Sequence, residues 1–351
     1  ERIIRFANSL VGWIRGGLGL TNVGASMLFG GITGTAVADA ASIGGVMIPG
    51  MKKAGYPADF SAAVTAASST VGPIIPPSVP MIIVGALSGI SVGKMFLAGA
   101  IPGILMGLAM MITTYLIARK KNFPKQDWQG FSEIGKSFVG AFWALAMTGI
   151  ILYGLLSGIA TPTETAIVAS VYAMVIGLFI YRELPVLEIP KIVVDSAVSA
   201  TGILLLVGFA NVFGWILVSE QIPQAIASAV LSFTDNKFLV ILIINILLLI
   251  VGMFMETIAA LIILFVPLLA LAVAVDIEPL HFATFAVLNL MIGLTTPPLG
   301  VCLFVCAGIA RLPLTPVVIA ILPFLFTNIL VLLLVSYVPA ISTWLPSVLM
   351  P

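Results

Sequence analysis

The sequence predicts an all-α protein that crosses a membrane several times and contains two inverted repeats. Three observations predict this fold: the composition, polar breaks inside long apolar segments, and the recurrence of those breaks in both halves. Hydrophobic residues make up 61% of the 351 positions and charged residues 8%, whereas a soluble domain has roughly 45–50% and 25%. So few charges could not cover a water-facing surface, so we expect a polytopic membrane protein.

The same composition excludes several classes of function. The net charge is +1, and the scattered Lys and Arg residues form no basic face for nucleic acid. A single histidine, His281, and two cysteines four positions apart, Cys302 and Cys306, do not form a metal or hydrolytic motif. No phosphate-binding Gly-x-x-x-x-Gly-Lys-Ser/Thr sequence occurs, which argues against an ATPase. We therefore expect no enzyme.

Residues 1–21 are predicted to form an interfacial amphipathic helix. Arg2, Arg5 and Arg15 alternate with isoleucine, phenylalanine and tryptophan side chains, a mixture typical of helices that lie in the membrane surface. The first residue is not methionine, and no signal-peptide core follows it. We expect the chain to begin inside a longer protein.

Two apolar segments contain a polar, glycine-bearing break near their middle. Residues 22–49 are interrupted at 30–35, and residues 237–275 are interrupted at 252–257. Each segment is too short for two comfortable spans of ~20 residues. We predict a re-entrant helical hairpin for each, because irregular backbone at membrane depth must lie inside protein or against water.

Each hairpin is followed by a predicted broken helix, at 57–90 and at 280–310. The breaks contain Pro76-Pro77 and Pro297-Pro298, each four residues after a glycine. Adjacent prolines remove amide donors and disfavour helix in the residue before them. Each segment should therefore form two half-helices with an unwound stretch between them.

These elements divide the chain into a first repeat at 22–118, which ends with a span at 94–118, and a second at 237–351, with a span at 313–338. Ordinary spans and interfacial segments at 119–236 should be scaffold and partner surface. Lys52, Lys53 and the basic residues from Arg119 onward place two loops in the cytoplasm. Counting spans from there makes the second hairpin enter from the opposite face, so the repeats are expected to be inverted.

Inverted repeats with discontinuous helices are typical of secondary transporters with a site near the membrane midplane. Unwound carbonyls and hydroxyls form small oxygen cages that suit a hard cation such as sodium. Ser78 should begin a half-helix, whose free amides attract an anion. The candidate sodium ligands are Gly34, Thr35, Ser69 and Gly72 in the first repeat, and Gly252, Thr257, Gly293 and Thr295 in the second.

Two acids lie near the predicted hairpin tips. A carboxylate at the membrane centre costs at least ~2.5–3.5 kcal/mol on insertion scales, so Glu256 suggests a function there. Its role stays open between sodium ligand, substrate contact and proton carrier, or it faces water at a solvated tip. Asp39 lies about one helical turn beyond the first tip, where it could cap the hairpin arm or serve the site directly.

Taken together, these motifs resemble the large membrane subunit of tripartite ATP-independent periplasmic (TRAP) transporters. They are the run at 31–41, the run at 69–81, Gly252 to Glu256, and Gly293 to Gly300. This chain departs from the family in lacking its first spans, and in having Thr33 and Thr35 where many relatives have serine. The resemblance covers essentially the whole chain.

The resemblance implies an elevator-type ion transporter of the bacterial inner membrane that uses sodium to import an organic acid, such as a C4-dicarboxylate or sialic acid. It also implies two partners, a small membrane subunit and a periplasmic binding protein. The implied substrate-binding residues are Thr33, Ser78, Glu256 and Thr296. A stand-alone sodium/dicarboxylate symporter would share the same hairpins, and a channel or a membrane enzyme fits the breaks less well.

Overall fold

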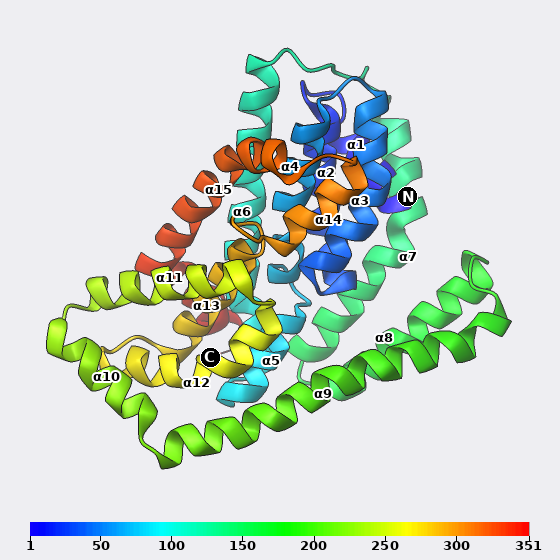
Figure 1. Cartoon of the computed structure of the whole chain (residues 1–351). Helices are drawn as coiled ribbons and strands as arrows, with labels where there is room; N and C mark the ends of the chain where they lie inside the picture. The colour runs from blue at the N-terminus through cyan, green and yellow to red at the C-terminus, as the bar shows by residue number, and fades with distance from the viewer. Residues whose placement is uncertain (351) are drawn as a thin grey trace.

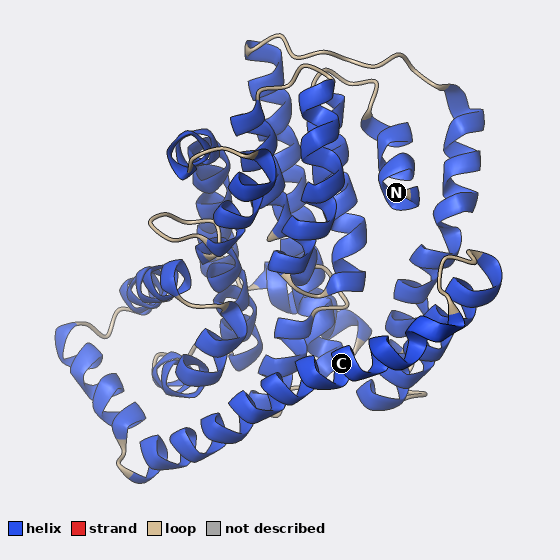
Figure 2. Ribbon diagram, turned by 45° about the vertical axis from the view of Figure 1, so that its right-hand side comes forward, coloured by secondary structure: helices blue, strands red, loops and turns tan. Residues whose placement is uncertain are grey.

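The computed structural model describes residues 1–350, except for the side chains at 32, 210, 211, 214, 218, 223 and 227. All regular secondary structure in this part of the chain is helical (Figure 2). Seven of the described helices are long and apolar enough to cross a membrane, or eight if a bent pair counts as one span. The predicted all-α polytopic membrane fold is therefore confirmed.

The first half of the chain contains a hairpin, a broken helix and a long span. Its helices are α1 (Arg2–Val11), α2 (Gly17–Thr33), α3 (Ala36–Lys53), α4 (Ala58–Ser69), η1 (Gly72–Ile74), α5 (Val79–Ser88) and α6 (Val92–Lys120). The amphipathic helix ends earlier than predicted and the hairpin begins earlier. The reason is a turn at Gly16, whose φ of 79° is accessible to glycine.

The second half repeats this order. Its helices are α11 (Lys237–Phe254), α12 (Thr257–Ala274), α13 (Pro279–Gly293), α14 (Val301–Ala310), α15 (Leu314–Tyr337) and α16 (Ala340–Leu349). Each arm of the second hairpin has 18 residues and could cross a membrane by length and composition. The interruption is shorter than the predicted one at 252–257, because only Met255 and Glu256 separate the two helices.

Both broken helices are interrupted at their Pro-Pro pairs. The first breaks after Ser69, contains the short 3-10 turn η1, and resumes at Val79 with a bend of 42°. The second breaks after Gly293 and resumes at Val301. Both Pro-Pro peptide bonds are cis. Each break leaves several backbone groups outside the regular helical pattern.

The middle of the chain is a peripheral arm (Figure 1). It contains α7 (Gly130–Leu156), α8 (Pro162–Val175), η2 (Ile176–Ile180), η3 (Val186–Glu188), α9 (Ile189–Ser219) and α10 (Ile222–Phe233). Thr161 and Glu164 form a reciprocal cap that starts α8. None of the apolar window within 186–209 is buried, so this surface is available for lipid or another protein.

The two repeats interlock. Helix α14 of the second repeat packs against α3 and α4 of the first, and α5 of the first packs against α12 and α13 of the second (Figure 1). The second half of each broken helix therefore belongs structurally to the other repeat. This exchange builds one buried core from both halves and brings the two breaks into one region.

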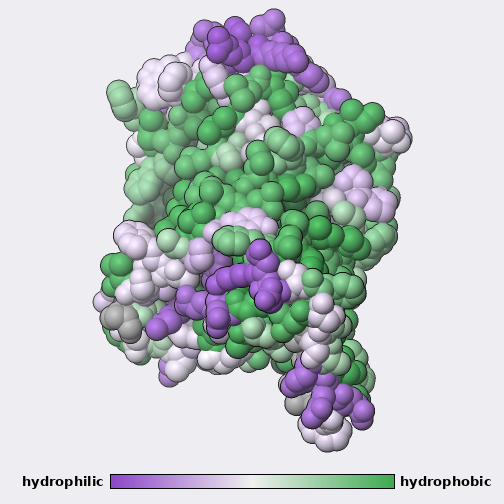
Figure 3. Space-filling model, turned by 90° about the vertical axis from the view of Figure 1, so that its left-hand side faces the viewer, coloured by the Kyte–Doolittle hydropathy of each residue, from purple (hydrophilic) through white to green (hydrophobic). Residues whose placement is uncertain are grey.

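The surface has the pattern expected for a membrane protein. One face is mostly hydrophobic below a hydrophilic cap at its upper end, and further hydrophilic residues lie across its lower part (Figure 3). Figure 1 places the end of α6 and the loop that follows it at that end, and this stretch contains Lys120, Lys121 and Lys125. A broad apolar band of this kind is stable only against lipid or a protein partner.

Candidate substrate and cation site

Three helix N-termini lie close together in the core. A β-carbon on Gly34 at the first tip would lie 2.5 Å from a methyl group of Val79, the first residue of α5. Val79 in turn packs against a small apolar cluster containing Ile258 at the start of α12. The N-cap residues of α3, α5 and α12 are Thr35, Ser78 and Glu256. Helix N-termini carry partial positive charge and free amides, so this region favours negative charge.

The first predicted cation site has a glycine–glycine backbone contact at its centre. A β-carbon on Gly30 of α2 would lie 1.9 Å from the α-carbon of Gly72 in the break. A β-carbon on Gly72 would lie 2.5 Å from Asp39 Oδ2 and 3.1 Å from the carbonyl oxygen of Ser26. Only two residues without side chains permit this approach. The hairpin and the break are thereby locked together around a carboxylate.

Asp39 is the only acidic side chain that is buried among the described residues. Its Oδ1 accepts a hydrogen bond of 2.7 Å from the hydroxyl of Thr33. Its Oδ2 is buried and has no hydrogen-bond partner in the described part of the chain. An isolated buried carboxylate is strongly unfavourable unless a cation, water or a proton compensates it. The unpartnered carboxylate oxygen of Asp39 is therefore a stronger indication of a cation site than the predicted hydroxyl ligands are.

The other predicted ligands of the first site make different hydrogen bonds. Gly34 ends α2 with a φ of 67°, and Thr35 begins α3 by accepting a bond from the amide of Ala38. Ser69 is buried beside Cys302 and donates to the carbonyl of Ala66. Both hydroxyl oxygens retain free lone pairs, so each can still face a cation.

The second predicted site has the same kind of contact, and a β-carbon on Gly293 would lie 2.5 Å from the α-carbon of Gly252. A β-carbon on Gly252 would lie 3.0 Å from the α-carbon of Gly293 and 3.3 Å from the carbonyl oxygen of Leu290. The hydroxyl of Thr257 is buried without a partner among the described atoms. Thr295 is fully buried and donates to the carbonyl of Ile292. The second site therefore offers neutral oxygens and no buried carboxylate in the described residues.

Glu256 caps its own helix. Its Oε2 accepts hydrogen bonds of 2.8 and 3.2 Å from the amides of Ile258 and Ala259, and the side chain is exposed. A carboxylate in this position satisfies two free amides and neutralises the helix end. The structure thus gives Glu256 a local structural role that the sequence analysis did not include among its alternatives.

The predicted substrate residues are not equivalent. Ser78 is buried and caps α5 by accepting a bond of 3.2 Å from the amide of Met81, which leaves the N-terminus of α5 without a formal charge. Thr33 is half-buried, with its proton committed to Asp39. Thr296 is nearly buried and donates back to Ile292. Of the three, only Ser78 lies at an uncharged helix N-terminus.

Each hairpin is hydrogen-bonded to its broken helix through an asparagine on its first arm, which was not predicted from the sequence. Asn22 on α2 accepts from Ser68 on α4, and Asn245 on α11 accepts from Asn289 on α13. The distances are 3.2 and 2.8 Å. Two asparagines at similar distances before the paired glycines, Gly30 and Gly252, were a readable signal. They support the geometry of both sites from the adjoining helices.

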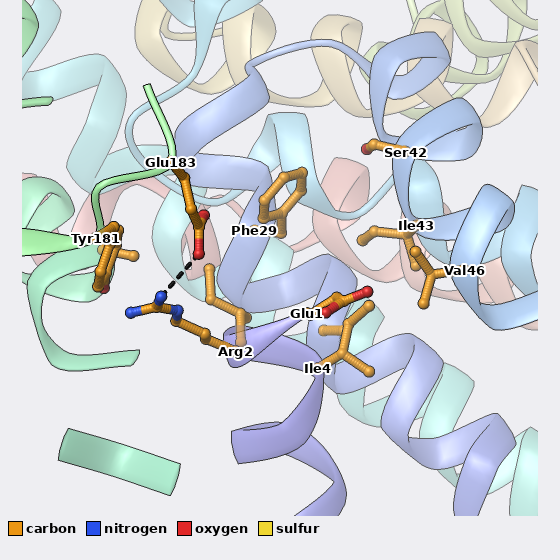
Figure 4. A pocket seen from close by; sticks show the side chains of 12 residues that line it. Glu1, Arg2, Ile4, Phe29, Ser42, Ile43, Val46, Tyr181 and Glu183 are labelled. Carbon is orange, nitrogen blue, oxygen red and sulfur yellow. Dashed lines mark hydrogen bonds and ion pairs between the residues drawn. The ribbon is translucent and has the colours of Figure 1, made fainter. Parts of the chain in front are cut away.

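A cavity of about 450 Å³ lies away from the paired glycines, between the first hairpin and the arm. Figure 4 shows Phe29 of α2 and Ile43 of α3 on one side and Tyr181 and Glu183 on the other. Arg2 closes one end by an ion pair of 2.7 Å with Glu183 and by stacking 3.8 Å above the ring of Tyr181. None of the predicted ligands lines this cavity.

Comparison with known proteins gives a consistent result. A family model described as the tripartite ATP-independent periplasmic transporter, DctM component, matches residues 1–341. The sialic acid TRAP transporter large permease protein SiaM of Vibrio cholerae is 42% identical over 346 residues, which is 99% of this chain and 81% of the relative.

Two further relatives are named for a C4-dicarboxylate and for sialic acid. The C4-dicarboxylate TRAP transporter large permease protein DctM of Pseudomonas aeruginosa is 40% identical, over 99% of this chain and 81% of the relative. The sialic acid TRAP transporter permease protein SiaT of Haemophilus influenzae is 38% identical, over all of this chain and 57% of the relative.

These matches confirm the resemblance read from the hairpin and break motifs. With seven or more apolar spans, they indicate a multi-pass protein of the bacterial inner membrane that belongs to a transporter and is not an enzyme. The chain is a member of the DctM family, the large permease component of tripartite ATP-independent periplasmic transporters.

Proposed function

We propose that this chain is the sodium-coupled transport subunit that imports an organic acid anion by an elevator-type movement of its two interlocked repeats. The relatives named above transport C4-dicarboxylates or sialic acid, and both are carboxylate anions. The observation that carries the proposal is the unpartnered Oδ2 of Asp39 beside Gly72. A sodium ion at that position would compensate the buried charge with oxygen ligands only.

The two cations would bind at the two glycine contacts. The first site would use Asp39 together with Gly34, Thr35, Ser69 and Gly72. The second site would use the predicted oxygens of Gly252, Thr257, Gly293 and Thr295. Because the second site has no buried carboxylate among the described residues, its ion would be held by neutral dipoles alone.

The substrate carboxylate would bind at the N-terminus of α5, beside Ser78. Ser78 is a neutral cap, so the partial positive charge of α5 remains available to an anion. Glu256 already neutralises the N-terminus of α12, and it would repel a second carboxylate there. Glu256, Thr33 and Thr296 are therefore proposed to contact hydroxyl or amide groups of the substrate rather than its carboxylate.

Movement of the repeats against the arm is supported by the apolar contact between them. Leu206, Phe209 and Phe213 of α9 face Ala259 and Ile262 of α12 across a narrow apolar gap. The side chains that the structure describes along this gap are apolar, so they set no fixed register between α9 and α12, which suits sliding. The arm would remain with the small membrane subunit while the repeats carry the ions and the anion.

The proposal is tested by uptake into proteoliposomes that contain this chain, its small membrane subunit and, outside, the periplasmic binding protein. We expect uptake of a radiolabelled C4-dicarboxylate or sialic acid to require an inward sodium gradient and to ignore ATP. Equal uptake with potassium in place of sodium would disprove sodium coupling. Equal uptake without the binding protein would instead favour a stand-alone symporter.

A further inference from the structure

Thr148 on α7 is an isolated hydroxyl in the middle of an arm helix. Between Phe138 and Leu156 the helix otherwise carries only aliphatic, sulfur-containing, glycine and aromatic residues. A threonine in an apolar helix usually donates to the carbonyl four residues earlier, as Thr201 does to Ala197 on α9. Thr148 makes no such bond. Its Oγ1 is buried and has no hydrogen-bond partner among the described atoms.

This hydroxyl faces the junction of the first hairpin and the first break. A β-carbon on Gly31 would lie 3.3 Å from Thr148 Oγ1, 3.3 Å from the carbonyl oxygen of Pro76 and 2.9 Å from the ring of Pro77. Three elements therefore meet at one glycine: the end of α2, the unwound backbone and the arm. The Pro76 carbonyl lies between the half-helices, and it borders the same glycine as the Thr148 hydroxyl.

The contact at Thr148 is local. One helical turn earlier on the same helix, Ala144 lines the cavity of about 450 Å³ that separates α7 from α2 and α3. Figure 4 shows that Phe29, Ser42 and Val46 of the hairpin border this space. The arm therefore stands away from the hairpin at Ala144 and closes onto it at Thr148.

We propose that Thr148 is a latch between the arm and the moving repeats. Its hydroxyl donates a hydrogen bond to the carbonyl of Pro76 during the transport cycle and holds the first hairpin against α7. The latch sets the rate at which the repeats leave this position. The inference builds on the proposed elevator movement, because a latch has meaning only between parts that move.

Thr148→Val removes the hydroxyl and keeps the shape, whereas Thr148→Ser keeps the hydroxyl. We expect the valine variant to change the maximal rate of sodium-driven uptake at least threefold, with unchanged half-saturating sodium and substrate concentrations. The serine variant should restore the rate. Thr201→Val is the matched control, because that hydroxyl bonds within its own helix. A changed half-saturating substrate concentration would show a substrate contact and overturn the latch, as would a normal rate in the valine variant.

A second experiment tests the contact itself. The test variant carries Gly31→Cys and Thr148→Cys, with Cys302 and Cys306 replaced by alanine. A β-carbon at position 31 would lie 3.3 Å from the Oγ1 position of Thr148, which is close to disulfide geometry. Oxidation should link the two residues and stop uptake, and reduction should restore it. If cysteine at Gly31 prevents folding, the comparison of Thr148→Val with Thr148→Ser tests the latch without this pair.

The outcomes separate the two proposals. If the folded Gly31→Cys plus Thr148→Cys variant forms no disulfide, the contact and the latch are wrong. If a disulfide forms and uptake continues, the repeats do not move against the arm, and the elevator proposal fails with the latch. If uptake depends on sodium and stops on oxidation, but Thr148→Val has a normal rate, only the latch fails.

Discussion

The two repeats share a backbone plan and differ in charge. Each has a hairpin, a Pro-Pro break and a pair of glycines that bring the two together. In the first repeat the glycine pair encloses the buried carboxylate of Asp39. In the second, the only acid near the tip is the exposed cap Glu256. The same backbone arrangement therefore surrounds a charged site in the first repeat and a neutral site in the second.

This difference indicates that the two predicted cation sites depend on sodium to different degrees, although their sequence patterns are alike. A buried carboxylate is unfavourable until a cation, water or a proton compensates it, so the first site gains most from a bound cation. A site made of carbonyls and hydroxyls can exist without one. We therefore expect the first repeat to dominate the sodium affinity and the second to tolerate substitution better, and the predictions below test this asymmetry.

Gly30→Ala should have the largest effect on folding. The added methyl group would lie 1.9 Å from the α-carbon of Gly72, and displacing backbone by overpacking costs about 3 kcal/mol at the upper end of the usual range. Gly252→Ala places its methyl group 3.0 Å from Gly293, so we expect about 1 kcal/mol there. Unfolding of the two purified variants measures the difference, and equal destabilisation would contradict the asymmetry.

Asp39→Asn should have the largest effect on transport in a protein that still folds. The substitution keeps the acceptor for Thr33 and removes the charge that would hold sodium. We expect a loss of about 100-fold in uptake, equivalent to about 2.7 kcal/mol, and a raised half-saturating sodium concentration. Folding should be unharmed, because a neutral amide is easier to bury.

The control for Asp39 is Asp276→Asn, which makes the same chemical change at an exposed loop position. This control should transport normally. If Asp39→Asn has normal sodium dependence, the Asp39 charge does not hold sodium. The proposed difference between the two repeats would then be wrong.

The sequence predicted the breaks well, because their cause is local. Pro76-Pro77 and Pro297-Pro298 disrupt helix wherever they occur, and the half-helices end and resume on either side of both pairs. Ser78 was predicted to begin a half-helix, and it caps α5. Such features depend on a few neighbouring residues, and the sequence contains them in full.

The contacts around the site could not be predicted, because they join residues far apart in the chain. Nothing near Asp39 in sequence shows that its carboxylate lies beside Gly72. Nothing in the second break shows that α14 packs against α3 and α4. Glu256 was given a possible role as ligand, whereas its position directly before Thr257 makes it the cap of α12.

Pro76→Ala and Pro297→Ala test whether both breaks are needed as breaks. Each substitution restores an amide donor and favours continuous helix, which would withdraw carbonyl groups from the site. We expect uptake to fall by about 30-fold, or about 2 kcal/mol, with normal amounts of folded protein. Pro102→Ala and Pro323→Ala, at prolines inside the continuous helices α6 and α15, are the controls. Normal transport in both break variants would show that the breaks are not sites.

Glu256→Gln should have the smallest effect, and it distinguishes a cap from a site residue. Glutamine retains a carbonyl oxygen that can accept from the amides of Ile258 and Ala259, but it loses the charge that favours the helix N-terminus. If Glu256 only caps α12, uptake should stay near normal. If it also contacts ion or substrate, we expect a tenfold loss, or about 1.4 kcal/mol.

The kinetics identify which contact Glu256 makes. A cation ligand would raise the half-saturating sodium concentration, and a substrate contact would raise the half-saturating substrate concentration. Because Asp39 supplies the buried charge in the first repeat, we expect Glu256→Gln to change the substrate dependence more than the sodium dependence. An effect on sodium as large as that of Asp39→Asn would show that the second repeat also depends on a formal charge, and the contrast between the two sites would then be wrong.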